Sequence, residues 1–304
     1  MSNSVSVIVS VYSKERLPYV IDCIESLKVQ TLLPIEVILV LDPDEDLVRF
    51  YQSRVAKDVR IVVSGNRGLS NARNAGVKHA SGEIVAFIDD DAVADERWLE
   101  RLVVVYNDPS VVGAGGFIRP LWEMHQPAWF PPELNWIIGC SYKGLPEHRA
   151  NVRNSIGCNM SFRREIFKKV GYFRTDVGRF GKTLLAGEEP EISMRIRNHI
   201  PNSRIIYEPS AVVNHRVGRN RVSPRYVWRR SFYEGVSKAM MTDPKSSDSS
   251  LSTESNYLGY LLRTAVPMRM RRIYSPKYLS QLMVLLFASA AVFLGFSAGK
   301  LGRR

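Results

Sequence analysis

The stretch IVAFIDDD, residues Ile84–Asp91, decides the fold that we expect for this chain. Its first five residues are apolar and rich in β-branched side chains, a pattern typical of a buried strand. The run then ends in three consecutive carboxylates, Asp89, Asp90 and Asp91. Neighbouring carboxylates repel one another, and beside a buried strand they also lose hydration. A solvated loop, a metal site and a phosphoryl-accepting nucleophile are the three arrangements that would make this triplet tolerable.

Strand-like and helical patterns alternate before and after this run. Apolar, β-branched runs predict strands at 4–13, 35–42, 59–65 and 83–91, and apolar residues at helical spacing predict helices at 15–30, 68–81 and 95–108. This alternation is typical of an α/β fold with a parallel sheet and right-handed crossovers. Ligands of such sheets bind at the carboxyl ends of the strands. Tyr12, Asp42 and the acidic triplet all lie at such ends.

The pattern changes after Pro120. Residues 122–144 are rich in Trp and Pro, which is typical of irregular or antiparallel structure. Further on, 157–173 predicts a strand and a helix, 187–200 a helix, and 204–217 two strands joined by a turn. We expect one α/β domain over 1–242, a Ser-rich linker over 243–256, a basic interfacial segment over 257–278 and a transmembrane helix over 279–299.

The last of these segments predicts a membrane anchor. Residues 279–299 carry no charge and are mostly apolar on all sides, unlike an amphipathic core helix. At ~1.5 Å per residue, a helix of this length just spans a ~30 Å hydrocarbon core. Positive residues are denser before this segment than after it, so we expect the α/β domain on the cytoplasmic side of the cell membrane.

The net charge points to an anionic partner. The 42 Lys and Arg residues exceed the 30 Asp and Glu residues by 12, which favours nucleic acid, a membrane surface or a phosphorylated ligand. The densest basic clusters lie at 216–230 and 263–272, towards the predicted anchor, so we expect lipid and no nucleic acid. Cys23, Cys140 and Cys158 are widely spaced without a CxxC pair, which predicts reduced thiols rather than disulfides or a zinc site.

Two arginines stand close to the acidic triplet in the sequence. Arg67 and Arg73 flank a predicted helix start at 68–70, and a helix N-terminus with arginines suits a diphosphate. Solvated surface charges are the alternative interpretation. The sequence DDDAV, residues 89–93, also fits the nucleophile motif of haloacid-dehalogenase-type phosphatases, but we find no later acidic metal pair of the kind that those enzymes carry.

Four motifs in order resemble one known family. The stretches are VSVIVSVYSKER (5–16), IEVILVLDPDED (35–46), NRGLSNARNAGVKHASGEIVAFIDDDAV (66–93) and GEEPEISMRIR (187–197). Together they resemble the inverting family 2 glycosyltransferases of GT-A fold, over roughly 4–217. The resemblance implies a Rossmann-like mixed sheet with helices on both faces, a nucleotide-sugar donor and a divalent metal, Mg²⁺ or Mn²⁺.

The same resemblance implies roles for individual residues in the nucleotide-sugar site. By position, the nucleotide contacts are Tyr12, Arg16, Asp42, Arg67 and Arg73, with Asp42 as the acid that binds the base. Asp89-x-Asp91 matches the DxD motif, with Asp89 near the ribose and the metal and Asp91 on the metal. Asp90 belongs to the same site without a role that we can assign.

A second set of residues matches the catalytic base and a further metal ligand. Glu188 and Glu189 stand where the family often has Glu-Asp, which makes Glu189 the expected base and Glu188 its neighbour. His215 falls where several GT-A enzymes place another metal ligand, and a purely structural histidine is the alternative.

A narrower resemblance concerns the substrates. FIDDDAVA, PPELNWIIGCSYKGLPEH, VRNSIGCNMSFRREIF and VWRRSFYEGVSKA resemble archaeal glycosyltransferases of the lipid-linked N-glycosylation pathway that act on glucosyl-dolichyl phosphate. This implies UDP-glucuronate as donor and a dolichyl-phosphate-linked sugar as acceptor. Another donor, a bare polyprenyl phosphate or a polysaccharide acceptor, and a non-catalytic membrane scaffold are the alternatives.

Two groups of side chains in the later part of the chain are candidates for acceptor contacts. Trp122, Trp129 and Trp136 are expected either to stack on a sugar or to pack within the protein. Arg229, Arg230 and Lys238 are expected to meet a lipid phosphate or lipid headgroups.

Overall fold

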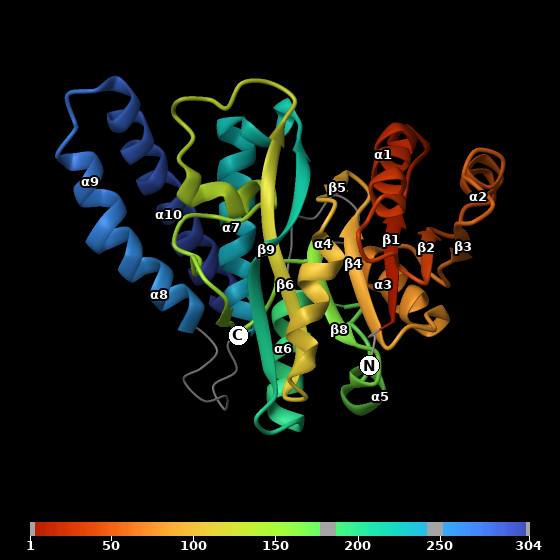
Figure 1. The fold of residues 1–304 in the computed structure, drawn as a ribbon. Coiled ribbons are helices and arrows are strands. Elements are labelled where there is room, and N and C mark those ends of the chain that lie inside the picture. Colours follow the sequence, from red (N-terminus) through yellow and green to blue (C-terminus); the bar gives the residue numbers. More distant parts are fainter. Residues whose placement is uncertain (1–3, 177–186, 242–251, 302–304) are drawn as a thin grey trace. The chain divides into compact units, whose positions relative to one another are not determined.

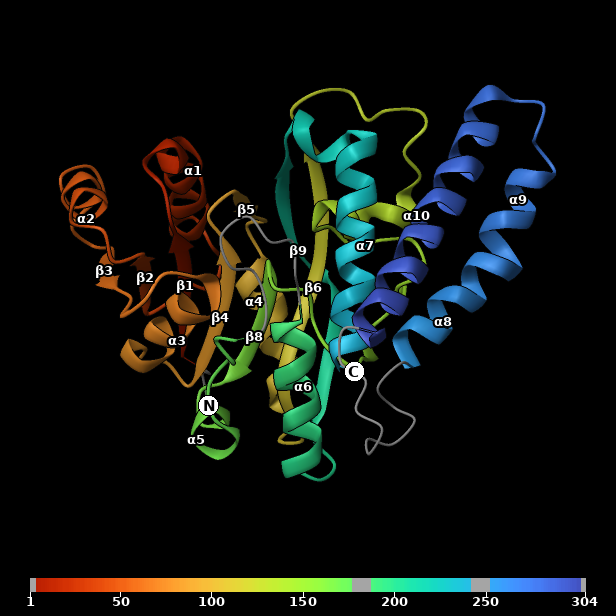
Figure 2. The same cartoon turned by 180° about the vertical axis from the view of Figure 1, so that it is seen from behind.

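The computed structural model describes residues 4–176, 187–241 and 252–301, which form two compact units (Figures 1 and 2). Among these residues, the first unit comprises 4–119, 146–176 and 188–215. The second unit comprises 120–145, Gly187, 216–241 and 252–301. Each unit is described by itself below.

The first unit is built on the parallel strands that the sequence predicts. These are β1 (Val5–Val11), β2 (Glu36–Leu41), β3 (Arg60–Val63) and β4 (Ile84–Asp89). β1 pairs in parallel with β2 and β4, and β2 pairs in parallel with β3. The register pairs Ser10 of β1 with Asp89 of β4, so the acidic triplet emerges at the carboxyl edge of the parallel strands.

Shorter and antiparallel strands extend the sheet. They are β5 (Ala92–Ala94), β6 (Val111–Trp122), β7 (Ala150–Asn151), β8 (Asn159–Arg163) and β9 (Arg204–Val217). The strand order is β3-β2-β1-β4-β8-β6-β9-β5, with β7 paired to β9. The last residues of β6 and β9 belong to the second unit. The expectation of a mixed sheet is therefore confirmed.

The helices of the first unit cover the sheet. They are α1 (Leu17–Lys28), α2 (Glu45–Gln52), α3 (Leu69–His79), α4 (Trp98–Val103), α5 (Ile166–Val170) and α6 (Glu188–His199), with 3-10 turns at Lys14–Arg16 and Val104–Asn107. Ile8 and Phe87 share a core cluster with buried residues of α3, α5 and α6, and Figure 2 shows α3 and α6 in front of the sheet. Val7 and Val9 point to the opposite face and are also fully buried, so both faces are covered.

One element differs from its prediction. Residues 204–217 form the single strand β9, whereas we expected two strands joined by a turn. The Glu208 carboxylate accepts hydrogen bonds from the backbone N–H and the hydroxyl of Ser210, at 3.1 and 2.5 Å, and stabilises the chain around the proline locally. β9 then pairs with β7 on one side of Pro209 and with β5 on the other.

The second unit is mainly helical. It contains 3-10 helices at Pro132–Ile138 and Arg219–Val222, then α7 (Pro224–Met241), α8 (Ser252–Tyr260), a π-helical turn (Leu261–Ala265), α9 (Val266–Met270) and α10 (Pro276–Leu301). α8 begins at Ser252, inside the range 243–256 that we expected to be a linker, and the rest of that range, 243–251, lies outside the described residues. α10 contains the whole of 279–299 and is long and apolar enough to cross a membrane.

α7 and α10 pack closely along their lengths. A Cβ atom at Gly235 would lie 2.0 Å from the carbonyl oxygen of Val292, and one at Gly295 would lie 1.9 Å from that of Phe232. Small residues that let helix backbones approach in this way are typical of helix pairs in membranes. The buried stripe of α10 consists of Gln281, Leu285, Ala288, Ala291 and Gly295. Its exposed face is apolar and includes Leu279, Met283, Leu286, Phe293 and Leu294.

Candidate active site

Strand register assembles the acidic end of β4 with two residues from distant parts of the chain. The antiparallel register pairs Ile88 with Asn159, so Asp89 comes to lie opposite Cys158. The register of β5 with β9 pairs Ala92 with His215, which brings this histidine beside Asp91. His215 Nε2 lies 3.3 Å from Asp91 Oδ1, and both side chains are buried.

These residues form a candidate metal site. The ligand atoms of Asp89, Cys158 and His215 all lie within 4.8 Å of one another, and Asp91 adjoins them through His215. Carboxylate, imidazole and thiol groups together suit a divalent transition metal better than Mg²⁺, which prefers oxygen ligands only. The side chains therefore fit the predicted divalent ion. Cys158 did not emerge from the sequence, because its partners come from strand pairing and not from a local CxxC spacing.

Asp90 binds Arg16. The Nε and Nη2 atoms of Arg16 donate to the two Asp90 carboxylate oxygens at 2.5 Å each, and Nη2 also lies 2.8 Å from Asp91 Oδ2. Burial raises the pKa of Asp90 to about 7, as does the charge of Asp91, whereas the Arg16 guanidinium opposes this rise. Burial lowers the pKa of Arg16, but the charges of Asp90 and Asp91 outweigh it and raise the pKa overall. Asp90 thus fixes the Arg16 guanidinium beside Asp91.

The other predicted nucleotide contacts surround the same edge of the sheet. Tyr12, which follows β1, is 64% exposed, and the Arg16 guanidinium lies 5.4 Å from its ring centroid. Asp42, which follows β2, accepts a hydrogen bond from the N–H of Gly68 at 3.3 Å. Burial raises the pKa of Asp42, and the Gly68 N–H opposes this rise. Arg67 is exposed and forms an ion pair with Asp44 at 3.2 Å.

Arg73 has partners other than those we expected. It is fully buried in α3, and its Nη1 lies 3.3 Å from Glu188 Oε1 and 3.4 Å from Glu189 Oε1 at the start of α6. The two glutamates differ in access, since the Glu188 side chain is 4% exposed and that of Glu189 is 16% exposed. Glu189 is therefore the more exposed of the two carboxylates, and Arg73 contacts both.

The electrostatics of this cluster raise the pKa of Glu189. Burial and the neighbouring charge of Glu188 raise the pKa of Glu189 to about 7, against the opposing charge of Arg73. Asp89 adds to the rise, so the two acidic clusters influence one another electrostatically. A positioned carboxylate with a pKa near the working pH is the usual arrangement for a general base.

Gly157 allows the glutamates and the arginine to meet. A Cβ atom at this position would lie 2.1 Å from Glu189 Oε1 and 2.4 Å from Arg73 Nη2. Such distances are far shorter than van der Waals contact, so any larger residue would displace one of the two side chains. Gly157 immediately precedes Cys158, and the loop before β8 therefore serves both the base and the metal site.

The predicted acceptor contacts in the second unit are mostly engaged within the protein. Trp122 and Trp129 pack edge-on against Phe130, and Trp136 donates to the Tyr257 hydroxyl at 3.3 Å. Of the cations, Arg230 and Lys238 pair with Glu234 at 2.8 and 3.2 Å, and Lys238 also pairs with Glu254 at 2.6 Å. The structure thus supports packing for the tryptophans and structural ion pairs for these two cations, while Arg229 is exposed.

A mixed sheet of this order, with DxD carboxylates at the end of a central strand and a second acidic pair at a helix start, has the GT-A fold. Residues 6–171 match the family described as Glycosyl transferase family 2, and the chain belongs to that family. A relative from Haloferax volcanii, named glucosyl-dolichyl phosphate glucuronosyltransferase, is 35% identical over 98% of this chain and 96% of its own length.

Solved structures share the fold at lower sequence identity. The mannosyltransferase PcManGT from Pyrobaculum calidifontis, in complex with GDP-Man and Mn²⁺, has a TM-score of 0.58 and 19% identity over 99% of this chain and 87% of its own. GalNAc-T7, with UDP, GalNAc and Mn²⁺, has a TM-score of 0.52 and 17% identity over 88% of this chain and 57% of its own.

Proposed function

We propose that this glycosyltransferase transfers a sugar with inversion from a nucleotide diphosphate donor to a lipid-linked sugar at the cell membrane. The narrower form is transfer of glucuronate from UDP-glucuronate to a dolichyl-phosphate-linked sugar in protein N-glycosylation. The Haloferax relative supports this form, because it matches the chain over almost the full length of both proteins. The observation that carries the chemistry is the accessible Glu189, held by buried Arg73 beside the acidic triplet.

The donor binds at the carboxyl edge of the parallel strands. Asp42 accepts hydrogen bonds from the base, Asp89 from the ribose, and Tyr12 lies beside them as an exposed ring. Arg67, with its side chain exposed, offers a cation to the diphosphate. Arg16 remains fixed by Asp90, so its guanidinium needs no reorganisation when the negative charge of the leaving group develops.

Asp91 and His215 would hold the divalent metal, with Asp89 and Cys158 within reach. When bound, such an ion offsets the charge of the departing diphosphate as a Lewis acid. Its positive charge would also relieve the mutual repulsion of the triplet, which Arg16 alone offsets only in part.

Glu189 takes the proton of the acceptor hydroxyl as that oxygen attacks the anomeric carbon from the face opposite the leaving group. A positioned base of this kind typically contributes ~10²–10⁴-fold to the rate. Glu188 raises the proton affinity of Glu189 by its charge, and Arg73 holds both carboxylates in place.

The membrane supplies the acceptor. α10 would anchor the chain through its exposed apolar face, and the positive residues before it favour a cytoplasmic position for the catalytic unit. A lipid-linked acceptor and the enzyme would then meet at the same surface.

The test is a screen of radiolabelled sugar nucleotides against glycosylated and bare dolichyl phosphates, with label in the lipid extract as the readout. We expect transfer from UDP-glucuronate to the glycosylated lipid. Label from another donor would reject glucuronate and leave the family assignment standing. Glu189→Gln should abolish transfer to a sugar hydroxyl, whereas retained turnover would indicate that the acceptor is a bare phosphate, which needs no base. Donor binding without turnover on any lipid would instead favour a scaffold.

A further inference from the structure

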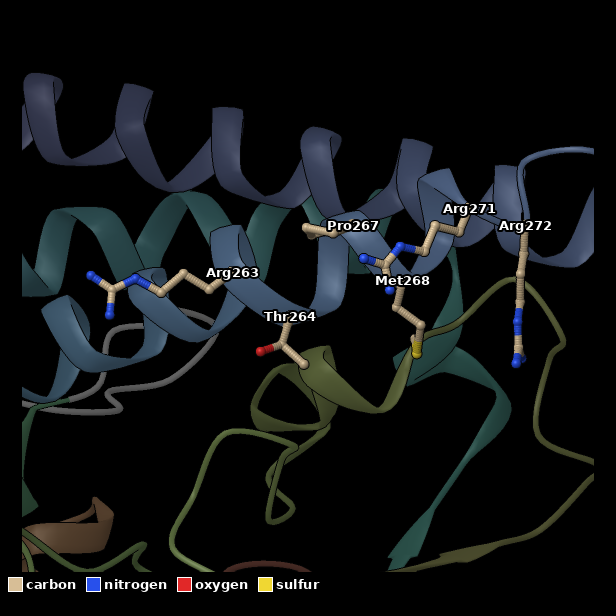
Figure 3. Close-up of a pocket in the computed structure, with 6 residues that line it drawn as sticks. All are labelled: Arg263, Thr264, Pro267, Met268, Arg271 and Arg272. Atoms are coloured by element: carbon tan, nitrogen blue, oxygen red, sulfur yellow. The ribbon is translucent and has the colours of Figure 1, made fainter.

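A hollow of about 300 Å³ lies on the segment 263–272 of the second unit (Figure 3). Its lining consists of Arg263, Thr264, Pro267, Met268, Arg271 and Arg272. Three of these six side chains are cations and none is an acid. Figure 3 shows Arg263 and Arg271 to either side of Thr264 and Pro267, with Arg272 beyond Arg271. The Arg271 side chain extends back towards Pro267 and Met268, whereas those of Arg263 and Arg272 extend away from it at the two ends of the hollow.

The charge of this hollow is not neutralised within the described residues. Arg263, Arg271 and Arg272 are exposed, and no carboxylate among the described residues lies within ion-pair distance of them. The neighbouring Arg269 behaves differently, since it is only 1% exposed and both its Nη atoms bind the Glu133 carboxylate, at 3.2 and 2.7 Å. Arg269 thus stabilises the fold, whereas the exposed Arg263, Arg271 and Arg272 are accessible to an external anion.

Arg269 also fixes the orientation of α9. Its Nε donates to Gln281 Oε1 of α10 at 3.1 Å, so the side of α9 that carries Arg269 is turned inward. Thr264, Pro267 or Met268, and Arg271 follow one another at helical spacing and therefore share another face. Arg272 is held by a hydrogen bond to the Tyr278 hydroxyl at 2.8 Å, which limits the freedom of its guanidinium.

Apolar side chains surround the arginines along the chain. Leu258, Leu262, Met270, Ile273 and Tyr274 are all exposed, and Tyr274 is 98% exposed. Exposed apolar residues mixed with arginines are typical of a segment at the membrane interface. The anion that reaches this hollow therefore belongs to a lipid.

The lining distinguishes between two kinds of lipid phosphate. A phospholipid separates its phosphate from the acyl chains by a glycerol and ester groups. In a polyprenyl phosphate the hydrocarbon chain begins at the phosphate oxygen itself. Pro267 and Met268 place apolar surface directly among the arginines, which matches the second arrangement. The Thr264 hydroxyl adds a donor for the phosphate.

We propose that Arg271 and Thr264 bind the phosphate of the polyprenyl-linked acceptor, with Pro267 and Met268 against the start of the lipid chain. Arg263 and Arg272 add positive charge at the two ends of the hollow. This assignment rests on the proposed function, because it gives the acceptor of that reaction its phosphate site. It replaces Arg230 and Lys238, whose charges are paired with Glu234 and Glu254.

The direct test measures binding of farnesyl phosphate to the full chain in neutral detergent by ³¹P NMR. Arg271→Gln should weaken binding by about tenfold, since charge-assisted hydrogen bonds are lost, and Arg263→Gln and Arg272→Gln should weaken it less. Arg225→Gln removes an equally exposed arginine of the same unit outside the hollow and should leave binding unchanged. Thr264→Glu places an acid in the hollow without removing any arginine, and it should weaken binding at least as much as Arg271→Gln.

Competition and kinetics complete the test. Dioctanoyl phosphatidylglycerol and inorganic phosphate should compete poorly, and equal competition by either would overturn the assignment to a polyprenyl phosphate. In turnover, the arginine substitutions should raise KM for the lipid acceptor and leave KM for the donor unchanged. If the arginine variants transferred sugar with an unaltered KM for the acceptor, the phosphate site would be rejected and the proposed function would stand. Farnesyl phosphate binding that depends on the arginines, in a protein that transfers no sugar, would reject the proposed function alone.

Discussion

At the scale of single residues, Glu189 governs the expected pH dependence. A general base acts only when deprotonated, and the pKa of Glu189 is raised to about 7 by burial and by Glu188. We therefore expect kcat/KM to fall about tenfold per pH unit below 7 and to level off above it. Glu188→Gln removes the neighbouring negative charge, so the acidic limb should move to lower pH. The measurement is kcat/KM against pH for the unsubstituted protein and for Glu188→Gln. If the acidic limb of the profile did not move, a group other than Glu189 would be responsible for it.

Cys158 predicts a spectroscopic property of the metal site. If its thiolate is a ligand, the protein loaded with Co²⁺ should show a near-ultraviolet thiolate-to-metal charge-transfer band. Cys158→Ser should lose that band while the visible cobalt bands remain. Cys23→Ser is the matched control, because Cys23 is also buried and its thiol donates to the Asp89 backbone carbonyl rather than joining the ligand cluster. A band that survives in Cys158→Ser would exclude the thiolate.

Adding a single methyl group at Gly157 is expected to separate Glu189, the proposed base, from Arg73. Gly157→Ala would bring a Cβ within 2.1 Å of Glu189 Oε1 and 2.4 Å of Arg73 Nη2. One of these groups must move, so we expect kcat to fall by about 10²-fold, as is usual when a catalytic group is misplaced by an ångström. Donor binding, measured by calorimetry, should change little. An active Gly157→Ala protein would mean that the base lies elsewhere.

At the scale of secondary-structure elements, the sequence pattern predicted the strands and helices that depend on neighbouring residues alone. β1 to β4 and α1, α3 and α6 arise from runs whose period is visible in the sequence, and their carboxyl ends carry Tyr12, Asp42 and the triplet as expected. Cys158 and Gly157 were missed because they join the site through the antiparallel pairing of β4 with β8, a contact between residues far apart in the chain. The family resemblance implied a nucleotide contact for Arg73, and the structure shows its buried guanidinium paired with Glu188 and Glu189 of α6.

The contact of α7 with α10 predicts opposite effects for two glycines of neighbouring helices. Gly295→Ala would place a Cβ 1.9 Å from the Phe232 carbonyl oxygen, and overpacking of this kind costs about 1–3 kcal/mol. Gly259→Ala in α8 meets nothing within 4 Å, so it should stabilise the helix by about 0.5–1 kcal/mol. Thermal unfolding in detergent compares the two. If Gly295→Ala left the stability unchanged, α10 would not pack against α7 in the membrane environment.

At the scale of the whole molecule, the distribution of charge and apolar surface bears on the membrane. The chain carries an excess of 12 positive charges, and the basic segment 263–272 immediately precedes α10. Lipid headgroups on the cytoplasmic leaflet are anionic and attract such segments by about 1 kcal/mol per cation near the surface. The catalytic unit and the acceptor site are therefore both expected on the cytoplasmic side.

Single cysteines can test this topology, because Cys23, Cys140 and Cys158 are buried and should not react with an impermeant maleimide. Tyr274→Cys lies before α10 at a position that is 98% exposed, and Lys300→Cys lies near its end and is also exposed. If α10 spans the bilayer, intact cells should label Lys300→Cys alone, and permeabilised cells should label both. Labelling of the two cysteines from the same side would contradict the span. It would place α10 along one leaflet, with its buried stripe on α7 and its apolar face in the lipid.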